Sequence, residues 1–328
     1  MEVVPYTPDC SRLWDSAVEA SRNGIFQHLR RYMDYHSDRF ADCSLMAIDG
    51  RGRIVAVLPA HRSDDGTTVS SHRGLTFGGW LMTARADMPA MMEIWELMTR
   101  HYADAGFSRL YYRPAPHIYH TYPAEEDLYA LFRAGGSLEA SQVSTVVDLS
   151  APLGFDMAAR QSVRKAAAAG ITVAGSDDYQ GFWQILPDLL RERHGASPVH
   201  TVDEIQLLHS RCPDNIRLYT ATREGRTIAG VVMYNTATAA HSQYTATTAE
   251  GRDMRALPLL YSHIMEQTLA QGIRWMDFGT SCEDAGRILN TGLVRQKCGF
   301  GGRAVVYNAY SVPLTYLRTA PAAGPTYG

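Results

Sequence analysis

Two residues with proton-transfer chemistry lie close together on one expected strand in the second half of the chain. His241 and Tyr244 belong to the segment HSQYTAT, residues 241–247. A histidine titrates near neutral pH and could act as a base, whereas the tyrosine could protonate a leaving thiolate. Because side chains alternate along a strand, an offset of three places the two on opposite faces. We therefore expect only one of them to face a cleft.

A carboxylate stands on the next expected strand. Asp277 lies in WMDFGTS, residues 275–281, which follows an apolar helical segment. An acidic side chain at a strand end beside a cleft could deprotonate or orient an ammonium substrate. The same side chain could instead cap the turn that follows the strand. Both interpretations of Asp277 stay open at this point.

The first half of the chain has its own candidates for ligand contacts. Tyr32 and His36 lie in QHLRRYMDYHSDRF, residues 27–40, which is dense in aromatic, histidine and charged residues. Such a segment suits the wall of a polar ligand site, or covers one face of a helix and turn. His72 lies in the glycine-rich SHRGLTFGGWL, residues 71–81, where a flexible backbone could approach a ligand closely.

An internal repeat indicates how these residues are positioned. SLMAIDGRGRIVAVLPAHRSDDGTTVSSHRG (44–74) and RLYTATREGRTIAGVVMYNTATAAHSQYTAT (217–247) each predict strand, Gly-Arg turn, strand, polar loop and strand. Each is followed by a helical pattern that ends in glycine and then by an apolar strand. The turn glycines Gly52 and Gly225 are 173 residues apart, and the helix-ending glycines Gly106 and Gly272 are 166 apart. We therefore predict a duplicated α/β unit, with domains at 1–150 and 151–328.

The segment between the copies predicts three helices. Residues 157–170, MAARQSVRKAAAAG, form an alanine-rich pattern with Gly170 as its natural end. Residues 177–194 give a second helical region, and residues 200–212 a third that Thr201 or Asp203 should cap.

Composition excludes several functional classes. The net charge of −3 argues against DNA binding, which requires a marked basic excess. The five cysteines are scattered without a CxxC pair, so neither a zinc site nor a disulfide framework is expected. No stretch approaches the roughly 20 apolar residues of a membrane helix, and no secretory signal is apparent. We expect a cytoplasmic protein that holds no metal.

The predicted order of a strand meander, a helix and a further strand resembles the fold of the GNAT acyltransferases. Several segments resemble more specifically the FemAB-like and BioF2-like branch of that superfamily, which carries two GNAT-like domains in one chain. These segments are RQSVRKAAAAGITV (160–173), LRERHGASPV (190–199), RTIAGVVMY (226–234), WMDFGTS (275–281) and GLVRQKCGFGG (292–302). The implied fold class is α/β (α+β), with two tandem domains, each a mixed, mostly antiparallel sheet flanked by helices.

The resemblance implies an N-acyltransferase that moves an acetyl or aminoacyl group from acyl-CoA to an amine on a small molecule or peptide. It places Lys297 near the transfer site, where a cation could stabilise an oxyanion. It places Arg193 at the substrate groove, where its planar fork could clamp a carboxylate or phosphate. Two alternatives remain: an aminoacyl-tRNA-dependent enzyme, disfavoured because no coiled-coil insertion is present, and a non-catalytic relative that binds an acyl donor or peptide.

In the GNAT fold the donor pyrophosphate lies at the N-terminus of the central helix, where unpaired N–H groups and the helix dipole favour an anion. In this chain the corresponding loop is TAEGRDMRALP, residues 248–258. It supplies Arg252, Arg255, Ala256 and Leu257 as candidate donor contacts. Its part RDMRALP, residues 252–258, lacks the glycines that normally permit close backbone approach.

Overall fold

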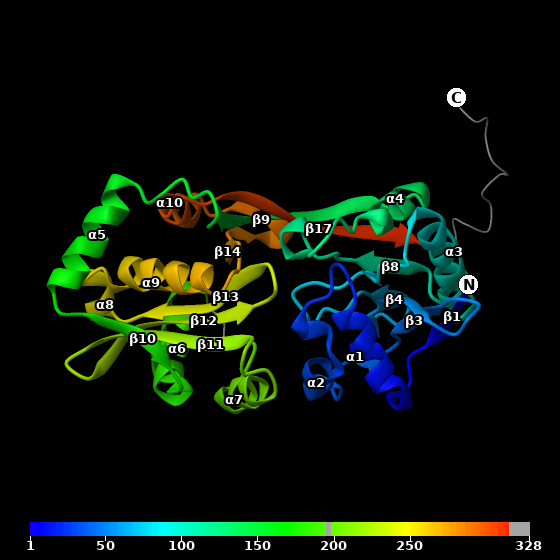
Figure 1. The fold of residues 1–328 in the computed structure, drawn as a ribbon, viewed down its shortest axis with the longest axis horizontal. Coiled ribbons are helices and arrows are strands. Elements are labelled where there is room, and N and C mark those ends of the chain that lie inside the picture. Colours follow the sequence, from blue (N-terminus) through cyan, green and yellow to red (C-terminus); the bar gives the residue numbers. More distant parts are fainter. Residues whose placement is uncertain (195–197, 315–328) are drawn as a thin grey trace, which may run out of the picture. The chain divides into compact units, whose positions relative to one another are not determined.

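The computed structural model describes residues 1–194 and 198–314. In the helix that ends at His194, it leaves the side chains of residues 187–194 undescribed. The chain divides into two compact units (Figure 1). The first contains residues 1–141 and the segment from Tyr307 onward, and the second contains residues 142–306. The predicted boundary at residue 150 falls within the second unit, and the chain returns to the first unit for its last strand.

The first unit contains two sheets with a long helix, α3. Its elements are β1 (Glu2–Pro5), α1 (Ser11–Glu19), α2 (Arg30–Met33), β2 (Ala41–Asp42), β3 (Leu45–Ile48), β4 (Ile54–Leu58), β5 (His61–Arg62), β6 (Thr68–Ser70), β7 (Leu81–Met82), α3 (Met88–Asp104), β8 (Arg109–Tyr112) and α4 (Glu126–Arg133). One sheet has the order β1-β3-β4-β7. In the other, β8 lies between the parallel strand β6 and the antiparallel strand β17 (Arg303–Pro313).

The second unit contains one longer sheet. Its elements are α5 (Met157–Ala168), β10 (Thr172–Ser176), α6 (Tyr179–His194), α7 (Val202–Arg211), β11 (Ile216–Arg223), β12 (Arg226–Asn235), β13 (Ala239–Thr247), α8 (Ala249–Asp253), α9 (Ala256–Ala270), β14 (Trp275–Thr280), β15 (Cys282–Glu283), β16 (Ile288–Leu289) and α10 (Thr291–Gly299). The strand order is β10-β11-β12-β13-β14-β9, where β9 spans Ser137–Asp148. All neighbours are antiparallel except β13 and β14, which α9 connects.

Glycines end corresponding elements of the two units. Gly52 and Gly225, each at φ +75°, turn the β3–β4 and β11–β12 hairpins. Gly106 and Gly272 follow α3 and α9 at φ +88° and +79°. These left-handed conformations cost an ordinary L-residue free energy that glycine avoids. The four positions from which the repeat was predicted therefore share a physical role in both units.

Helices cover both faces of the second unit's sheet. Ala229 and Val231 of β12 belong to a core with α9 and α5, whereas a Cβ on the intervening Gly230 would meet the Phe182 ring of α6 at 2.4 Å. Successive strand residues point to opposite faces, so α9 and α6 lie on opposite sides (Figure 1). We call these sides the α9 face and the α6 face.

The helices predicted between the copies are present. α5 begins at Met157 and is followed by Gly170 at φ +72°. Thr201 caps α7: its side chain accepts from the Glu204 N–H, and the Glu204 side chain accepts from the Thr201 N–H. This reciprocal capping box satisfies two N–H groups that the helix leaves without partners.

Candidate active site

The strands β13 and β14 run together for only three residue pairs. Their register joins Ala239 to Trp275, Ala240 to Met276 and His241 to Asp277. Beyond this last pair, β13 continues to Thr247 and β14 to Thr280, but the two strands no longer pair with each other. His241 and Asp277 therefore lie where the two strands begin to separate.

His241 and Asp277 form a direct pair. His241 Nδ1 lies 2.9 Å from Asp277 Oδ2, and the two side chains are 13% and 0% exposed. The other carboxylate oxygen of Asp277 accepts from Ser144 Oγ at 2.5 Å and from the Gly279 N–H at 2.9 Å. Asp277 therefore both holds the irregular end of β14, where Gly279 is left-handed, and orients His241. A neutral His241 that donates from Nδ1 carries its basic lone pair on Nε2.

The prediction that His241 and Tyr244 face opposite sides is wrong, because β13 contains a β-bulge. Val232 pairs with Tyr244 and Met233 with Ser242, so Gln243 is an extra residue. Ser242 and Thr245 both contact the hydroxyl of Tyr261 on α9, at 3.0 and 2.7 Å. The bulge thus shifts the alternation by one, and it brings His241 and Tyr244 together on the α6 face.

Tyr244 is held by residues of the α6 face. Its hydroxyl lies 2.5 Å from His200 Nδ1, and its ring packs edge-on against Trp183 of α6 at 5.3 Å. Burial raises the pKa of Tyr244 to about 12, so its hydroxyl keeps its proton at neutral pH. Tyr244 is therefore an available proton donor rather than a base.

Lys297 is buried, contrary to the usual surface position of lysine. It lies on α10 with 8% exposure. Its ammonium donates to Gly279 O at 2.8 Å, Thr280 O at 3.1 Å and Ser281 Oγ at 2.9 Å. Burial lowers the pKa of Lys297 to about 8, although the negative charge of Asp277 opposes this shift. The structure thus brings His241, Tyr244, Asp277 and Lys297 to the same part of the second unit.

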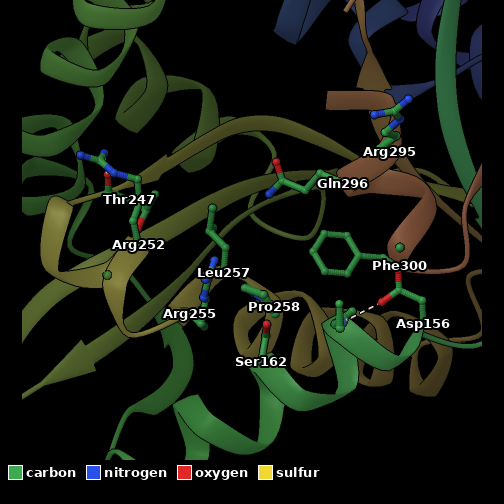
Figure 2. A pocket seen from close by; sticks show the side chains of 14 residues that line it. Asp156, Ser162, Thr247, Arg252, Arg255, Leu257, Pro258, Arg295, Gln296 and Phe300 are labelled. Carbon is green, nitrogen blue, oxygen red and sulfur yellow. Dashed lines mark hydrogen bonds between the residues drawn. The ribbon is translucent and has the colours of Figure 1, made fainter. Parts of the chain in front are cut away.

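A pocket of about 370 Å³ opens beside the N-terminus of α9 (Figure 2). It is lined by Asp156, Ala158, Ala159, Ser162, Thr247, Gly251, Arg252, Arg255, Leu257, Pro258, Arg295, Gln296, Gly299 and Phe300. Figure 2 shows Arg252 and Arg255 on one side and Asp156 and Phe300 on the other, with Leu257 and Gln296 between them. The predicted donor contacts Arg252, Arg255 and Leu257 line this pocket. Ala256 is the buried first residue of α9 and does not line it.

The predicted loop before α9 is mostly a short helix. α8 occupies Ala249–Asp253, which leaves Met254 and Arg255 as the connection. Arg255 adopts a left-handed conformation, φ +62°, where glycine would be expected, and no side chain caps α9. Right-handed Met254 followed by left-handed Arg255 has the backbone pattern of an anion-binding nest. The backbone approach that glycine usually permits is therefore achieved by an arginine.

The first-unit candidates lie in a buried cluster. Tyr32, His36 and His72 are 2%, 2% and 5% exposed. His36 stacks on His72 with ring centroids 5.1 Å apart, and His61 lies 5.2 Å from His72. Burial lowers the pKa of His72 to about 2. The three histidines pack against one another, whereas Tyr32 packs edge-on against Phe26 and Tyr35. Arg193 lies on α6, and its side chain is outside the described residues.

Several residues of the site were not predicted from the sequence. Ser144, Gly279, His200 and Ser281 each hold one of the predicted residues in place. One sequence signal does mark Lys297: only two of the 31 basic residues are lysines, the other being Lys165. Within the described ranges no group of three His, Cys, Asp or Glu side chains could hold a metal ion. No helix among these residues is long and apolar enough to span a membrane.

Comparison with known proteins agrees with this geometry. Residues 157–285 match the family model of the acetyltransferase (GNAT) domain, which includes His241 and Asp277. No curated protein matches the chain in sequence.

Three solved structures share the fold over most of their length. FemX is 12% identical, with a TM-score of 0.69 over 97% of this chain and 98% of FemX. L-PGS from Bacillus licheniformis is 13% identical, with a TM-score of 0.59 over 94% and 91%. The C-terminal domain of a putative lysylphosphatidylglycerol synthetase from Agrobacterium fabrum is 13% identical, with a TM-score of 0.57 over 90% and 91%. Residues 157–285 therefore form a GNAT acetyltransferase domain, and the chain shares the fold of FemX over most of its length.

Proposed function

We propose that this protein is an N-acyltransferase that moves an acyl group from an activated donor to an amine acceptor by direct attack in the second unit. The observation that supports this most is the His241–Asp277 pair at the separation of β13 and β14. A histidine oriented by a buried carboxylate is suited to remove a proton from an attacking nitrogen. The acceptor is a small molecule or peptide that presents an amine.

The proposed reaction needs one base and one acid. The acceptor nitrogen forms a bond to the acyl carbon while its proton passes to His241 Nε2, and the bond from that carbon to the leaving sulfur then breaks. Tyr244 lies on the same face and retains its proton at neutral pH, so it can protonate the leaving thiolate, with His200 as the partner that restores the proton. The products are an amide and a free thiol.

The proposed donor is acyl-CoA, with its phosphates at the N-terminus of α9. Arg252, Arg255 and Arg295 line the pocket there and are exposed. No carboxylate in the described part of the chain forms an ion pair with any of them. Uncompensated arginines beside an uncapped helix N-terminus favour a phosphate.

Aminoacyl-tRNA is the second candidate donor. The fold similarity to FemX and to the lysylphosphatidylglycerol synthetases supports it, and the same arginines could contact a nucleic-acid phosphate. A tRNA donor predicts binding that weakens steeply with salt. The opening between the strands and the proposed base would serve either donor.

Binding and turnover together distinguish the candidates. We would measure thermal shifts and amide formation with acetyl-CoA, CoA and aminoacyl-tRNA, using a panel of amine acceptors. Stabilisation by acetyl-CoA that rises with its concentration, together with an amide product, is the expected result. Stabilisation by charged tRNA alone would replace acyl-CoA with the second candidate. Binding without product for any donor would leave the non-catalytic interpretation and contradict the proposal.

A further inference from the structure

Lys297 occupies a place that suits an ammonium better than a guanidinium. Twenty-nine of the 31 basic residues are arginines, yet a lysine stands at this buried position. An ammonium presents three N–H groups from a single atom, whereas a guanidinium presents its donors in a flat fork. The three acceptors belong to the consecutive residues Gly279, Thr280 and Ser281, which form the turn at the end of β14, where Gly279 is left-handed. The three acceptors surround the Lys297 ammonium, and this arrangement suits three N–H groups on a single nitrogen atom.

These three contacts use all the donors of Lys297. A lysine ammonium has three N–H groups and no acceptor, and each group has a partner between 2.8 and 3.1 Å away. A hydrogen bond to the oxyanion of a reacting carbonyl would require one of these contacts to break. This occupancy argues against the oxyanion role that the sequence resemblance implies.

The turn that Lys297 holds carries two contacts of the proposed catalytic pair. Gly279 has φ +73°, and its N–H donates to Asp277 Oδ1 at 2.9 Å. A Cβ on Gly279 would lie 3.2 Å from His241 Cε1, so Gly279 lies close to the imidazole ring. A change in this turn would therefore disturb the contacts of both Asp277 and His241.

We propose that Lys297 is a positioning residue, which fixes the turn at the end of β14 and thereby holds Asp277 and His241 in their productive arrangement. This inference rests on the proposed function, because it assigns the proton transfer to His241. The ammonium form is required, since a neutral amine offers one N–H fewer. With the pKa of Lys297 lowered to about 8, turnover should decline as the pH rises above that value.

A double-mutant cycle tests this role. We expect Lys297→Met to lower kcat by about 10-fold with little change in KM for the donor, and we expect the same substitution to have almost no further effect in an Asp277→Asn background. A residue that acts through Asp277 loses its influence once the pair is broken. If the two effects multiply instead, Lys297 acts independently, as an oxyanion donor would, and the inference is wrong.

A milder variant covers the case in which Lys297→Met does not fold. Ser281→Ala removes one acceptor and keeps the lysine, so it should lower kcat if the turn must be fixed. An unchanged or higher kcat in Ser281→Ala would contradict the inference, because it would free a donor for the oxyanion. Lys165→Met, on the exposed surface of α5, is the matched control and should leave kcat unchanged.

The inference and the proposed function can fail separately. If His241→Gln retains full kcat, the proposed function fails and the inference fails with it. If His241→Gln is inactive but the Lys297 and Asp277 effects multiply, only the inference fails. Hydrogen exchange at the Gly279 amide gives a structural readout: it should speed up in Lys297→Met and remain slow in Lys165→Met.

Discussion

The central helices of the two units begin in opposite ways. In the first unit, the side chain of Asp87 caps α3 by accepting from the Ala90 N–H at 3.0 Å. In the second unit, α9 begins after left-handed Arg255 and has no side-chain cap. A carboxylate neutralises the positive end of a helix dipole and repels a phosphate, whereas an arginine attracts one. The same scaffold therefore favours a phosphate in one copy and disfavours it in the other.

The two units also differ in their parallel strand pairs, which are β6 with β8 in the first unit and β13 with β14 in the second. In the first unit, the segment after β6 stays bonded along β8: the Gly78 N–H donates to Arg113 O at 2.8 Å, and the Arg113 N–H donates to Ser71 Oγ at 2.8 Å. In the second unit, β13 and β14 separate after His241 and Asp277. The two units thus share the arrangement of strands and helix, but they differ in whether the two parallel strands stay bonded or separate.

Each unit also buries an aspartate near the strand that follows its central helix. Asp277 has hydrogen-bond partners for both oxygens. In the first unit, Asp127 accepts from the Tyr112 hydroxyl of β8, but its Oδ1 has no partner within the described part of the chain. Burial raises the pKa of Asp127 to about 7. The carboxylate of the second unit is therefore fully hydrogen-bonded, whereas burial of the carboxylate in the first unit disfavours its charged form.

The largest expected effect is a loss of kcat that occurs when the second unit is mutated and not when the first is. His241→Gln should lower kcat by roughly 1,000-fold, within the usual range for loss of a general base. Steady-state kinetics of purified variants measures this change. His72→Gln, in the corresponding segment of the first unit, should keep kcat per folded molecule, as normalised by circular dichroism. Equal losses in both variants would end the assignment of chemistry to the second unit.

A second test uses the pH dependence of stability. Because the folded-state pKa of Asp127 is about 7 and its ordinary value is 3.8, the native state binds more protons than the unfolded state between these values. Stability from this group should therefore fall as the pH rises, by roughly 3 kcal/mol between pH 4.5 and 7. Urea unfolding of wild type and Asp127→Asn would measure it. The variant should lose this decrease in unfolding free energy with rising pH. If the decrease is unchanged, groups other than Asp127 cause it.

A third, smaller effect tests the contrast between the helix N-termini. Arg255→Glu should raise KM for acyl-CoA by about 10-fold, because it places a negative charge where the donor phosphates are proposed to bind. Asp87→Asn changes the equivalent helix end in the first unit and should leave KM unchanged. Steady-state kinetics with acyl-CoA as the varied substrate measures KM for both variants. If only Asp87→Asn weakened donor binding, the donor site would have to be assigned to the first unit.

The smallest effect isolates the backbone at Arg255. Arg255→Gly keeps the left-handed conformation without its steric cost, so it should stabilise the protein by roughly 1 kcal/mol while removing one donor contact. Thermal unfolding together with KM for acyl-CoA measures both consequences. Destabilisation by this substitution would mean that the arginine side chain, rather than the backbone, maintains the start of α9.

The sequence predicted the repeated elements because their signals are local. Gly52 and Gly225 turn hairpins, and Gly106 and Gly272 end helices, through conformations that depend on neighbouring residues alone. The fold class followed from the order of these elements and from family resemblance. The capping of α7 by Thr201 was readable for the same reason.

The arrangement of the site was only partly predictable, because it depends on contacts between distant segments. Ser144 and Asp277 are 133 positions apart in the chain, and no local pattern marks that hydrogen bond. Burial of Lys297 similarly depends on how α10 packs against the end of β14. The error about His241 and Tyr244 has another cause: a regular strand was assumed, and a bulge leaves no obvious composition signal.

The extra residue in β13 also has a consequence for comparing this chain with its relatives. Deleting Gln243 would restore strict alternation of the side chains along β13. The residues on one side of the deletion would then point to the opposite face of the sheet. Tyr244 and His241 would then point in opposite directions, so the proposed acid and the proposed base would be on different sides of the sheet. In an alignment, a one-residue gap at Gln243 would therefore mark relatives in which these two side chains cannot act from the same face.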